Sequence, residues 1–531
     1  MFASDIITDD YKNWADGDKV LLKLPVNSGK STFITSILHR YALSIDAEIL
    51  YLTDRKILET QLVSDMCKKM DIPSTYFEND SIKELQGITF ITYQAMEEIL
   101  SNNTTSNSLK YFKFIVMDEI SYLSSDMEFN PKMVRIARWL ENLQTSILIL
   151  ISATMYDTID YIWKDRENWD LISSSENRDI YQCQVPNLST IVNGRRPMLY
   201  MYMMEPPKRN FRVFIFDDID EIVSMINHDN TEQRWLIFQS NKEKAKERVM
   251  NKLEVTFDII TAYNKQSEVM QQITTDKKFS AKALIATKVL DVGVSIHDHT
   301  LLKIVMNSAD EGEFTQMLGR RRIGNPEEIV NIYIPRRNAK YFGTIRRKQI
   351  MPKLEFLKLH PSEIIEEIHD SKLAYDYFRQ LCDVQNGKIQ KNWISEVELK
   401  KKLRNYLEIE ARIKEDLNYF ADLQMSWIGE KNIVEVIDLA EEKKILMFNR
   451  LVEVLKLRVD KKLDKKAQLE FRNDIKECLH CLIPENFSHP KRILGLQLIN
   501  KCLADLHIPY NVVSISPKVK GEETKWLVKE N

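Results

Sequence analysis

Short apolar runs recur through the first 340 residues of the chain and alternate with segments of helical periodicity. Runs of this length, separated by helices, are typical of a parallel sheet that is covered by helices on both faces. They form two groups on either side of a stretch rich in Asn, Gly and Pro, namely 20–24, 49–53, 88–92, 114–117 and 147–151, then 235–238, 257–261, 283–286, 302–306 and 329–334. The pattern predicts two α/β domains in tandem.

Beyond residue 340 the strand signal fades. Residues 395–470 carry long charged and apolar periodic patterns, such as EVELKKKLRNYLEIEARIKEDLNYF, which predict helices. The end of the chain reads as a helix followed by two short strands and a polar turn, a pattern compatible with a small winged-helix module. We therefore expect four parts: α/β domains at 1–205 and 206–340, a helical domain at 341–480, and a small α/β or winged-helix-like module at 481–531.

Composition narrows the class of protein. A chain of 531 residues is too long for one core, and 44% hydrophobic with 29% charged residues is ordinary for a globular protein. No apolar run approaches the roughly 18 residues of a membrane span, and Asp5, Asp9 and Asp10 stand where a signal peptide needs basic charge, so we expect no membrane association and a cytoplasmic location. The net charge of −3 leaves only local basic patches as a means of binding a polyanion.

The stretch LPVNSGKST, which begins at Leu24, lies between a predicted strand and a predicted helix, where a phosphate-binding loop belongs. Backbone N–H groups of residues 27–31 would point at phosphate oxygens, Lys30 would reach the β- and γ-phosphates, and Ser31 would reach Mg²⁺. Asn27 tolerates the positive φ for which many such loops use glycine. Because Leu24 replaces the first glycine of the motif, a chance Gly-Lys-Ser at a helix start is the alternative.

Two acids, Asp118 and Glu119, directly follow the apolar run 114–117. A phosphate loop needs a carboxylate partner from the end of a neighbouring buried strand. Asp118 would hold the metal, mostly through its water shell, and Glu119 would orient the attacking water. Such a pair is common on its own, but together with the loop it predicts a site that hydrolyses a nucleoside triphosphate.

Over roughly residues 20–335 the chain resembles a superfamily 2 helicase of the DEAD/DEAH-related group. Eight segments match the motifs of that family in order, namely LPVNSGKST (motif I), YLTDRKILETQ (Ia), ITYQAM (the next nucleic-acid-contacting motif), MDEISYL (II), ISATM (III), WLIFQSNKEKA (IV), ATKVLDVGVSI (V) and QMLGRRR (VI). Their number and order favour a real phosphate loop over chance. The resemblance implies two RecA-like domains, ATP and Mg²⁺ as ligands, and movement on a nucleic-acid strand.

The resemblance also implies a role for individual residues. Those that would contact the nucleotide are Asn27, Ser28, Gly29, Lys30, Ser31, Thr32, Asp291 and Gly293. Those that would act in hydrolysis are Lys30, Asp118, Glu119, Gln316, Arg320 and Arg322, the last three from the second domain. Ser152 and Thr154 would couple the ATP site to the strand track, and the nucleic-acid backbone would be contacted by Arg55, Thr92 and Thr287.

The chain departs from the family pattern at three points. Ser121 stands in motif II where related families have His or Asp, and Ile323 takes the place of the second arginine of motif VI. Arg321 or Arg322 would substitute for that arginine, and the sequence leaves both open. No adenine-reading glutamine segment precedes the loop, which weakens an assignment to the DEAD-box RNA helicases.

Two functions follow as hypotheses. The first is an ATP-dependent helicase or translocase, with single-stranded DNA favoured and RNA as the other strand. The second is an ATP-switched nucleic-acid-binding or assembly factor that does not unwind. In the helicase hypothesis, the helical region would form a side wall of the strand track, and basic helix faces at 400–404 or 461–466 would contact the strand. The alternative is that these segments are ordinary solvated helix faces.

Overall fold

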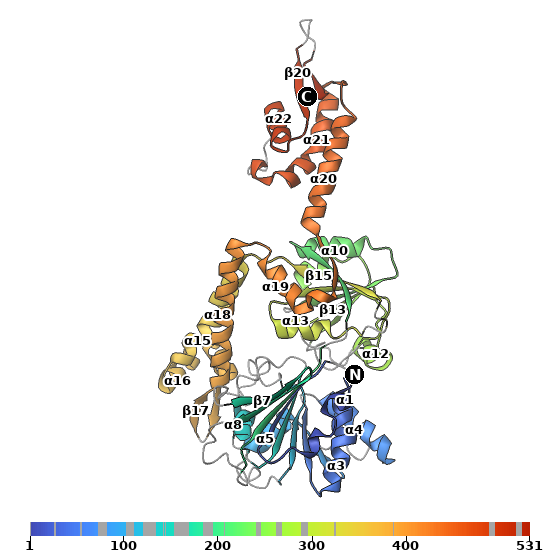
Figure 1. The fold of residues 1–531 in the computed structure, drawn as a ribbon. Coiled ribbons are helices and arrows are strands. Elements are labelled where there is room, and N and C mark those ends of the chain that lie inside the picture. Colours follow the sequence, from blue (N-terminus) through green and yellow to red (C-terminus); the bar gives the residue numbers. More distant parts are fainter. Residues whose placement is uncertain are drawn as a thin grey trace.

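The computed structural model describes residues 2–25, 28–53, 56–72, 82–101, 111–120, 134–141, 143, 145–152, 169–183, 195–205, 208–239, 246–261, 268–287, 296–322, 325, 327–385, 387–487, 494–516 and 523–530. Two α/β domains lie one above the other, a helical arm runs beside them, and a smaller module projects from the second domain (Figure 1). The predicted fold class is confirmed. None of the helices in the described part is both long and apolar enough to cross a membrane.

The first domain is built on a nine-stranded sheet with the order β3-β4-β2-β5-β6-β1-β9-β8-β7. Its strands are β1 (Lys19–Lys23), β2 (Ile49–Thr53), β3 (Ile82–Leu85), β4 (Ile88–Thr92), β5 (Phe114–Met117), β6 (Ile147–Ser152), β7 (Trp169–Ser175), β8 (Arg178–Cys183) and β9 (Met198–Met203). The run from β4 to β9 is parallel, and β3, β8 and β7 add antiparallel edges. The five predicted strands form the centre, where both faces are buried.

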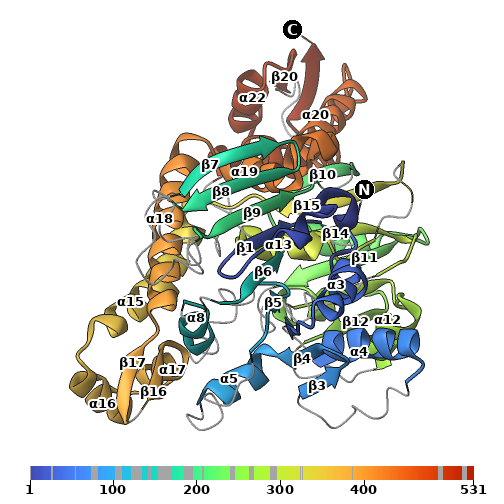
Figure 2. The same cartoon turned by 60° about the horizontal axis from the view of Figure 1, so that its bottom comes forward.

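Helices cover both faces of this sheet (Figure 2). The described helices are α1 (Ala3–Ile7), α2 (Lys30–Thr32), the π-helical Phe33–Leu38, α3 (His39–Ser44), α4 (Lys56–Met70), α5 (Tyr93–Ser101) and α8 (Val134–Glu141). Alternate residues of a strand enter different cores: Val20 and Leu22 pack with Phe33 and Ile34, whereas Leu21 packs on the other face. The helix that follows β1 is therefore held against the sheet directly after the phosphate loop.

The second domain has a seven-stranded sheet with the order β12-β13-β11-β14-β15-β10-β18. All its pairings are parallel, and its strands are β10 (Asn210–Phe216), β11 (Arg234–Gln239), β12 (Phe257–Ile260), β13 (Ala283–Ala286), β14 (Leu301–Asn307), β15 (Ile329–Pro335) and β18 (Ile433–Asp438). Its described α-helices are α10 (Ile219–Asn227), α12 (Glu268–Asp276) and α13 (Glu311–Leu318). The chain crosses from the first sheet to the second between Met203 and Asn210.

A helical arm leaves the second domain after β15 and returns to it. Its elements are α14 (Ala339–Ile345), the π-helical Arg346–Ile350, α15 (Met351–Lys358), α16 (Pro361–Asp370), α17 (Lys372–Leu381), β16 (Cys382–Gln385), β17 (Lys388–Lys391), α18 (Trp393–Glu415) and α19 (Tyr419–Ile428). At the returning end, Ala421 lies in the core of the second domain. At the far end, Nε and Nη2 of Arg135 in α8 each donate a 2.8 Å hydrogen bond to Asp383, and Ile394 joins the core of the first domain. The arm therefore bridges the two domains.

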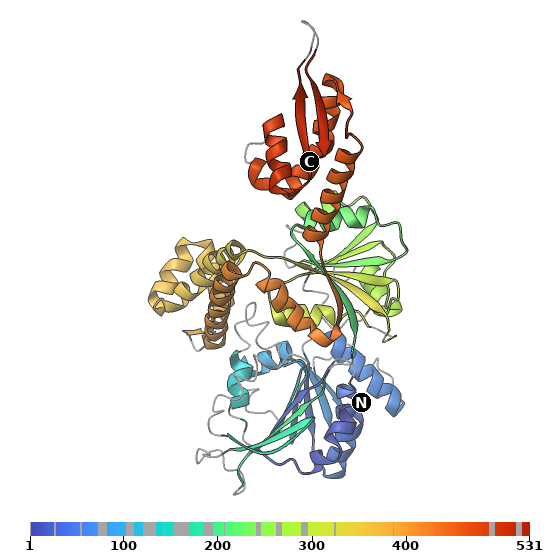
Figure 3. The ribbon, with the colours of Figure 1, turned by 45° about the horizontal axis from the view of Figure 1, so that its top comes forward.

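The C-terminal module begins earlier in the chain than the sequence predicts. One core from Met447 to Val528 joins α20 (Leu439–Lys456), β19 (Lys462–Leu463), α21 (Lys465–Leu482), α22 (Leu496–Asp505), β20 (Tyr510–Ile515) and β21 (Lys525–Glu530). The three strands form an antiparallel sheet beside the helices (Figure 3). The boundary predicted between 480 and 481 is wrong because it falls inside α21, whose residues pack in the same core as the strands.

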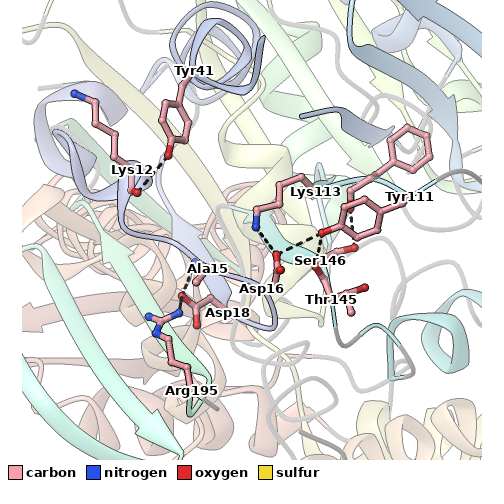
Figure 4. Close-up of polar contacts among 11 residues, drawn as sticks. Lys12, Ala15, Asp16, Asp18, Tyr41, Tyr111, Lys113, Thr145, Ser146 and Arg195 are labelled. Carbon is pink, nitrogen blue, oxygen red and sulfur yellow. Dashed lines mark hydrogen bonds and ion pairs between the residues drawn. The ribbon is translucent and has the colours of Figure 1, made fainter. Parts of the chain in front are cut away.

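A polar cluster lies at the amino edge of the first sheet, beside the starts of β1, β5 and β9 (Figure 4). The fully buried carboxylate of Asp18 accepts hydrogen bonds from the backbone N–H of Ala15 (2.9 Å), from that of Met198 (2.8 Å) and from Nη1 of Arg195 (2.9 Å). Lys113 forms an ion pair with Asp16 beside it. This cluster fixes the edge that lies opposite the phosphate loop.

Candidate functional site

The phosphate loop leads from β1 into α2, as the sequence predicts. Gly29 has a φ of +77° at the residue before the helix, which is the left-handed conformation that favours glycine. The carbonyl of Ser28 accepts a 2.6 Å hydrogen bond from the N–H of Ala3, so the N-terminal segment supports the loop. Thr32 is exposed, and Asn27 lies outside the described residues.

The ammonium group of Lys30 bends back over its own loop and donates a 2.8 Å hydrogen bond to the carbonyl of Leu24. Part of this side chain remains accessible, but the ammonium lies deep among protein atoms. Burial therefore lowers the pKa of Lys30, while the nearby carboxylates of Glu119 and Asp118 act to raise it. The loop lysine and the acid pair of the sequence analysis thus lie together.

The acid pair stands at the carboxyl end of β5. Oδ2 of Asp118 accepts a 2.7 Å hydrogen bond from the hydroxyl of Tyr51, and Oδ1 accepts a 3.1 Å bond from the N–H of Glu119. Burial raises the pKa of Asp118, and the bond from Tyr51 opposes that shift. Glu119 has a φ of +50°, which is uncommon for a residue other than glycine and is often found at functional sites.

Ser152, at the end of β6, reaches the same site. Its hydroxyl donates a 2.8 Å hydrogen bond to Oε1 of Glu119. The segment that resembles motif III is therefore in direct contact with the segment that resembles motif II. Thr154, the other residue predicted to couple ATP to the strand, lies outside the described residues.

The side-chain oxygen atoms of Ser31 and Asp118 are suitable ligands for Mg²⁺ beside a nucleotide. Burial raises the pKa of the Tyr51 hydroxyl, and the nearby Ser31 side chain acts to lower it, so Ser31 and Asp118 both lie beside this one group. A serine hydroxyl and a carboxylate are hard oxygen ligands of the kind that Mg²⁺ prefers, and Mg²⁺ usually keeps several waters and takes few protein ligands. Ser31 and Asp118 would hold the metal, with the ammonium of Lys30 near the phosphates.

Three consecutive arginines follow α13 in the second domain, and the structure separates two of them. Arg321 is almost fully buried: its Nε donates a 3.0 Å hydrogen bond to the carbonyl of Leu301, and its Nη2 lies 2.6 Å from Oε2 of Glu328. Both partners belong to the second domain. Arg321 therefore stabilises the second domain through these contacts.

Arg322, in contrast, interacts electrostatically with the first domain. Its positive charge is close enough to act on Lys30 and lower the pKa of that ammonium group. Burial, followed by the charges of Arg320 and Arg209, lowers the pKa of Arg322 itself to about 10. Arg322 therefore still carries its charge at neutral pH. The guanidinium of Arg322 in the second domain therefore lies near Lys30 in the phosphate loop of the first domain.

The remaining predicted residues are dispersed. Thr92 ends β4 and its hydroxyl accepts a 3.2 Å hydrogen bond from the N–H of Ala95, whereas Thr287 directly follows β13 in the other domain. Gln316 lies on α13, one turn before the arginines. The residues Arg55, Asp291 and Gly293 lie outside the described part of the chain, as do Ser121 and Ile323.

Sequence reasoning missed Tyr51. It stands in the middle of an apolar run and pairs with Val116 on the neighbouring strand β5. A tyrosine in a fully buried strand needs a hydrogen-bond partner for its hydroxyl, but that partner, Asp118, can be identified only once the pairing of β2 with β5 is known. The available signal was therefore the residue type alone.

Two family models match the chain. The model described as DEAD/DEAH box helicase matches residues 8–162, and the model described as helicase conserved C-terminal domain matches residues 216–324. Each span lies within one of the two α/β domains, and together they contain every motif segment of the sequence analysis.

One curated relative and two solved structures give the range of similarity. The probable ATP-dependent RNA helicase ddx49 of Dictyostelium discoideum is 21% identical over 330 residues, which cover 57% of this chain and 58% of the relative. The chain thus spans less than two thirds of that relative. Dbp5 of S. cerevisiae bound to RNA and ADP BeF3 has 15% identity and a TM-score of 0.38, covering 60% of this chain and 78% of its own. A DEAD box protein from Methanococcus jannaschii has 16% identity and a TM-score of 0.32, covering 65% and 88%.

Proposed function

Because the chain belongs to the DEAD/DEAH box helicases of superfamily 2, we propose that it hydrolyses ATP between its two α/β domains and couples hydrolysis to a nucleic-acid strand. The observation that carries the proposal is the meeting of Lys30, Asp118 and Glu119 from the first domain with Arg322 from the second. Each supplies a function that phosphoryl transfer needs.

In this proposal the residues of the first domain bind the nucleotide and prepare the attacking water. The loop N–H groups and Lys30 bind the phosphates, with Asn27, Ser28, Gly29 and Thr32 shaping the loop. Ser31 and Asp118 would hold Mg²⁺, which would supply positive charge near the phosphates. The carboxylate of Glu119, oriented by Ser152, accepts a hydrogen bond from the attacking water and polarises it.

The second domain completes the site. Arg322 stabilises negative charge on the transferring phosphoryl group, and Gln316 and Arg320 lie on the same side of the cleft. Arg321 is the weaker candidate because its guanidinium is already held by Leu301 and Glu328. Since the arginine belongs to a separately folded body, hydrolysis depends on closure of the two domains, which also excludes water.

The strand would cross both domains and be held mainly through its phosphates. Thr92 in the first domain, Thr287 in the second and Arg55 would contact the backbone. Ser152 and Thr154 would couple these contacts to the ATP site. Such binding is strongly salt-dependent and weakly sequence-selective. The sequence alone favoured single-stranded DNA, but the curated relative is named an RNA helicase, so RNA is the first strand to test.

The test is an ATPase titration with single-stranded RNA, single-stranded DNA and duplex DNA in parallel. We expect at least one single strand to raise the rate, and Lys30→Ala to abolish hydrolysis. Lys358→Ala, which changes an exposed lysine on α15, is the matched control and should leave the rate unchanged. The proposal is wrong if no strand stimulates the wild-type chain.

A second function is favoured by the arm. The ion pair between Arg135 and Asp383 joins the first domain to an arm that is rooted in the second, and this contact restrains their relative movement. A restrained pair of domains suits a switch that closes on ATP and signals to a partner without unwinding. A strand-displacement assay separates the two functions: hydrolysis with strand binding but no displacement supports the switch.

A further inference from the structure

A cavity of about 460 Å³ opens where the helical arm leaves the second domain. It lies beyond the carboxyl ends of β10 and β15, beside α14 and the π-helical segment that follows. Its charged lining consists of one acid, Asp217, and four bases: Arg336, Arg337, Lys340 and Lys348. A volume in this range is typical of a ligand site, and its charge selects for an anion.

Among the residues that the structure describes, only one of the four bases forms an ion pair. Arg336 forms ion pairs with both Asp217 and Asp438 and donates a 2.9 Å hydrogen bond to Asn418. By contrast, Arg337, Lys340 and Lys348 have no carboxylate within ion-pair distance among the described residues. Asp217, the acid of the cavity lining, is therefore already paired with Arg336, and the other three basic side chains leave the cavity positively charged.

Arg337 makes the strongest case for a ligand. Its guanidinium stacks on the ring of Tyr341, 4.6 Å from the ring centroid, and donates a hydrogen bond to Oδ1 of Asn307. Burial lowers the pKa of Arg337, and the charge of Arg248 lowers it further. A desolvated guanidinium without an ionic partner costs free energy, which a phosphate group could offset with paired hydrogen bonds.

The position of the cavity favours a strand as the source of that phosphate. All strands of the second sheet are parallel, so its carboxyl edge carries both the cavity and Thr287, a predicted backbone contact. Asn307, which holds Arg337, also donates a 2.8 Å hydrogen bond to Oε1 of Gln239, and Gln239 belongs to the segment that resembles motif IV. A continuous polar connection thus links the cavity to a motif segment.

We propose that this cavity, with Arg337, Lys340 and Lys348, is a phosphate-binding subsite for the backbone of the nucleic-acid strand beyond the helicase motifs. The inference rests on the proposed function and deepens it, since it assigns to the root of the arm a part in holding the strand. A strand that reaches this point would touch both the second domain and the arm.

The test compares the wild-type chain with the double variant Lys340→Ala/Lys348→Ala by fluorescence anisotropy of a labelled single strand over a range of salt concentrations. Both lysines are exposed, and neither has an ionic partner in the described part of the chain, so the variant should fold normally. We expect the slope of log affinity against log salt to fall by about two. We also expect affinity to drop roughly tenfold at about 0.15 M salt. Arg337→Gln should weaken binding in the same direction.

The control is Lys358→Ala/Lys372→Ala, which removes two exposed lysines of the arm outside the cavity and should leave the slope unchanged. If the wild-type chain binds strands and the cavity variant matches it in affinity and slope, the subsite is overturned while the proposed function stands. If inorganic phosphate binding depends on the two lysines but strand binding does not, the cavity serves a small anion and the assignment to a strand is overturned. A wild-type chain that binds no strand overturns both.

Discussion

The hydroxyl of Tyr51 donates a 2.7 Å hydrogen bond to Oδ2 of Asp118, and the Ser31 side chain lies close enough to that hydroxyl to act on its pKa. The two side chains that we expect to hold Mg²⁺ therefore both lie beside a buried group from a third segment of the chain. Tyr51 lies on β2, which is paired with the strand that carries Asp118. It would act on the metal through the residues that it orients, as a positioning residue.

Tyr51→Phe should weaken the Mg²⁺ dependence of nucleotide binding while keeping the ring in place. Loss of a partner of a metal-binding residue typically reduces metal affinity by about 10-fold or more. The measurement is a Mg²⁺ titration of fluorescent-nucleotide binding. Tyr93→Phe is the matched control, because the Tyr93 hydroxyl bonds the backbone carbonyl of Asp118 and leaves its carboxylate untouched. An unchanged Mg²⁺ midpoint in Tyr51→Phe would rule out the positioning role.

Nucleotide binding should be linked to protonation of Lys30 at alkaline pH. Burial lowers the pKa of Lys30 in the free protein, and bound phosphates would raise it. As pH rises through the lowered pKa, the free protein loses this proton while the complex keeps it, so affinity falls and binding takes up a proton. Calorimetry in two buffers of different ionisation enthalpy measures the uptake. Proton release on binding under alkaline conditions would contradict this account.

The ion pair that fastens the arm to the first domain should contribute measurably to stability. The side chains of Arg135 and Asp383 are 12% and 5% exposed, so removing one leaves the other as a largely buried charge without its ionic partner. We expect Arg135→Ala to lower the free energy of unfolding by about 3 kcal/mol, and Arg135→Ala/Asp383→Ala to cost much less than the sum of the single changes.

Denaturant unfolding of the four proteins of this cycle gives the coupling energy directly. Arg450→Ala provides the comparison, because its pair with Glu477 is largely exposed and should be worth less than about 1 kcal/mol. Additive effects of Arg135→Ala and Asp383→Ala would mean that the arm is not fastened by this contact.

The polar cluster at the amino edge of the first sheet should matter for folding and not for the site. Asp18→Ala would leave Arg195 and two backbone N–H groups without their acceptor inside the protein, and we expect a loss of roughly 3 kcal/mol. Nucleotide affinity, measured where the variant is folded, should match that of the wild type, because the cluster lies at the edge opposite the loop. Asp9→Ala, an exposed position, should have little effect on stability. A variant of normal stability but poor nucleotide affinity would reverse this assignment.

The parts of the fold that the sequence predicted are those with both faces buried. The runs 49–53, 88–92, 114–117 and 283–286 match their strands to the residue, because a strand covered on both sides is apolar at most of its positions. The strand β7 was missed since its residues, including Leu171 and Ile172, are largely exposed and carry no such run. The strand β18 was missed because it joins the second sheet only after the whole arm has intervened.

The residues of the candidate site likewise fall into those that the sequence predicts and those that depend on tertiary contacts. Lys30, Asp118 and Glu119 could be predicted because each follows a buried strand of the central sheet, where local sequence determines position. The choice between Arg321 and Arg322 could not be made, since it depends on a contact of Arg321 with Glu328 across a turn and on the placement of the whole second domain. The subsite at Arg337 and the role of Tyr51 likewise depend on tertiary neighbours.

The central claim is that two domains share one hydrolytic site, with Arg322 as the residue that the second domain contributes. Single-turnover hydrolysis of ATP by Arg322→Ala, at saturating nucleotide and strand, tests this claim most directly. We predict a rate about 1,000-fold below that of the wild type, with nucleotide affinity and stability little changed. Arg321→Ala should instead lower stability, because it removes buried contacts within the second domain. A rate for Arg322→Ala within a few-fold of the wild type would contradict the account.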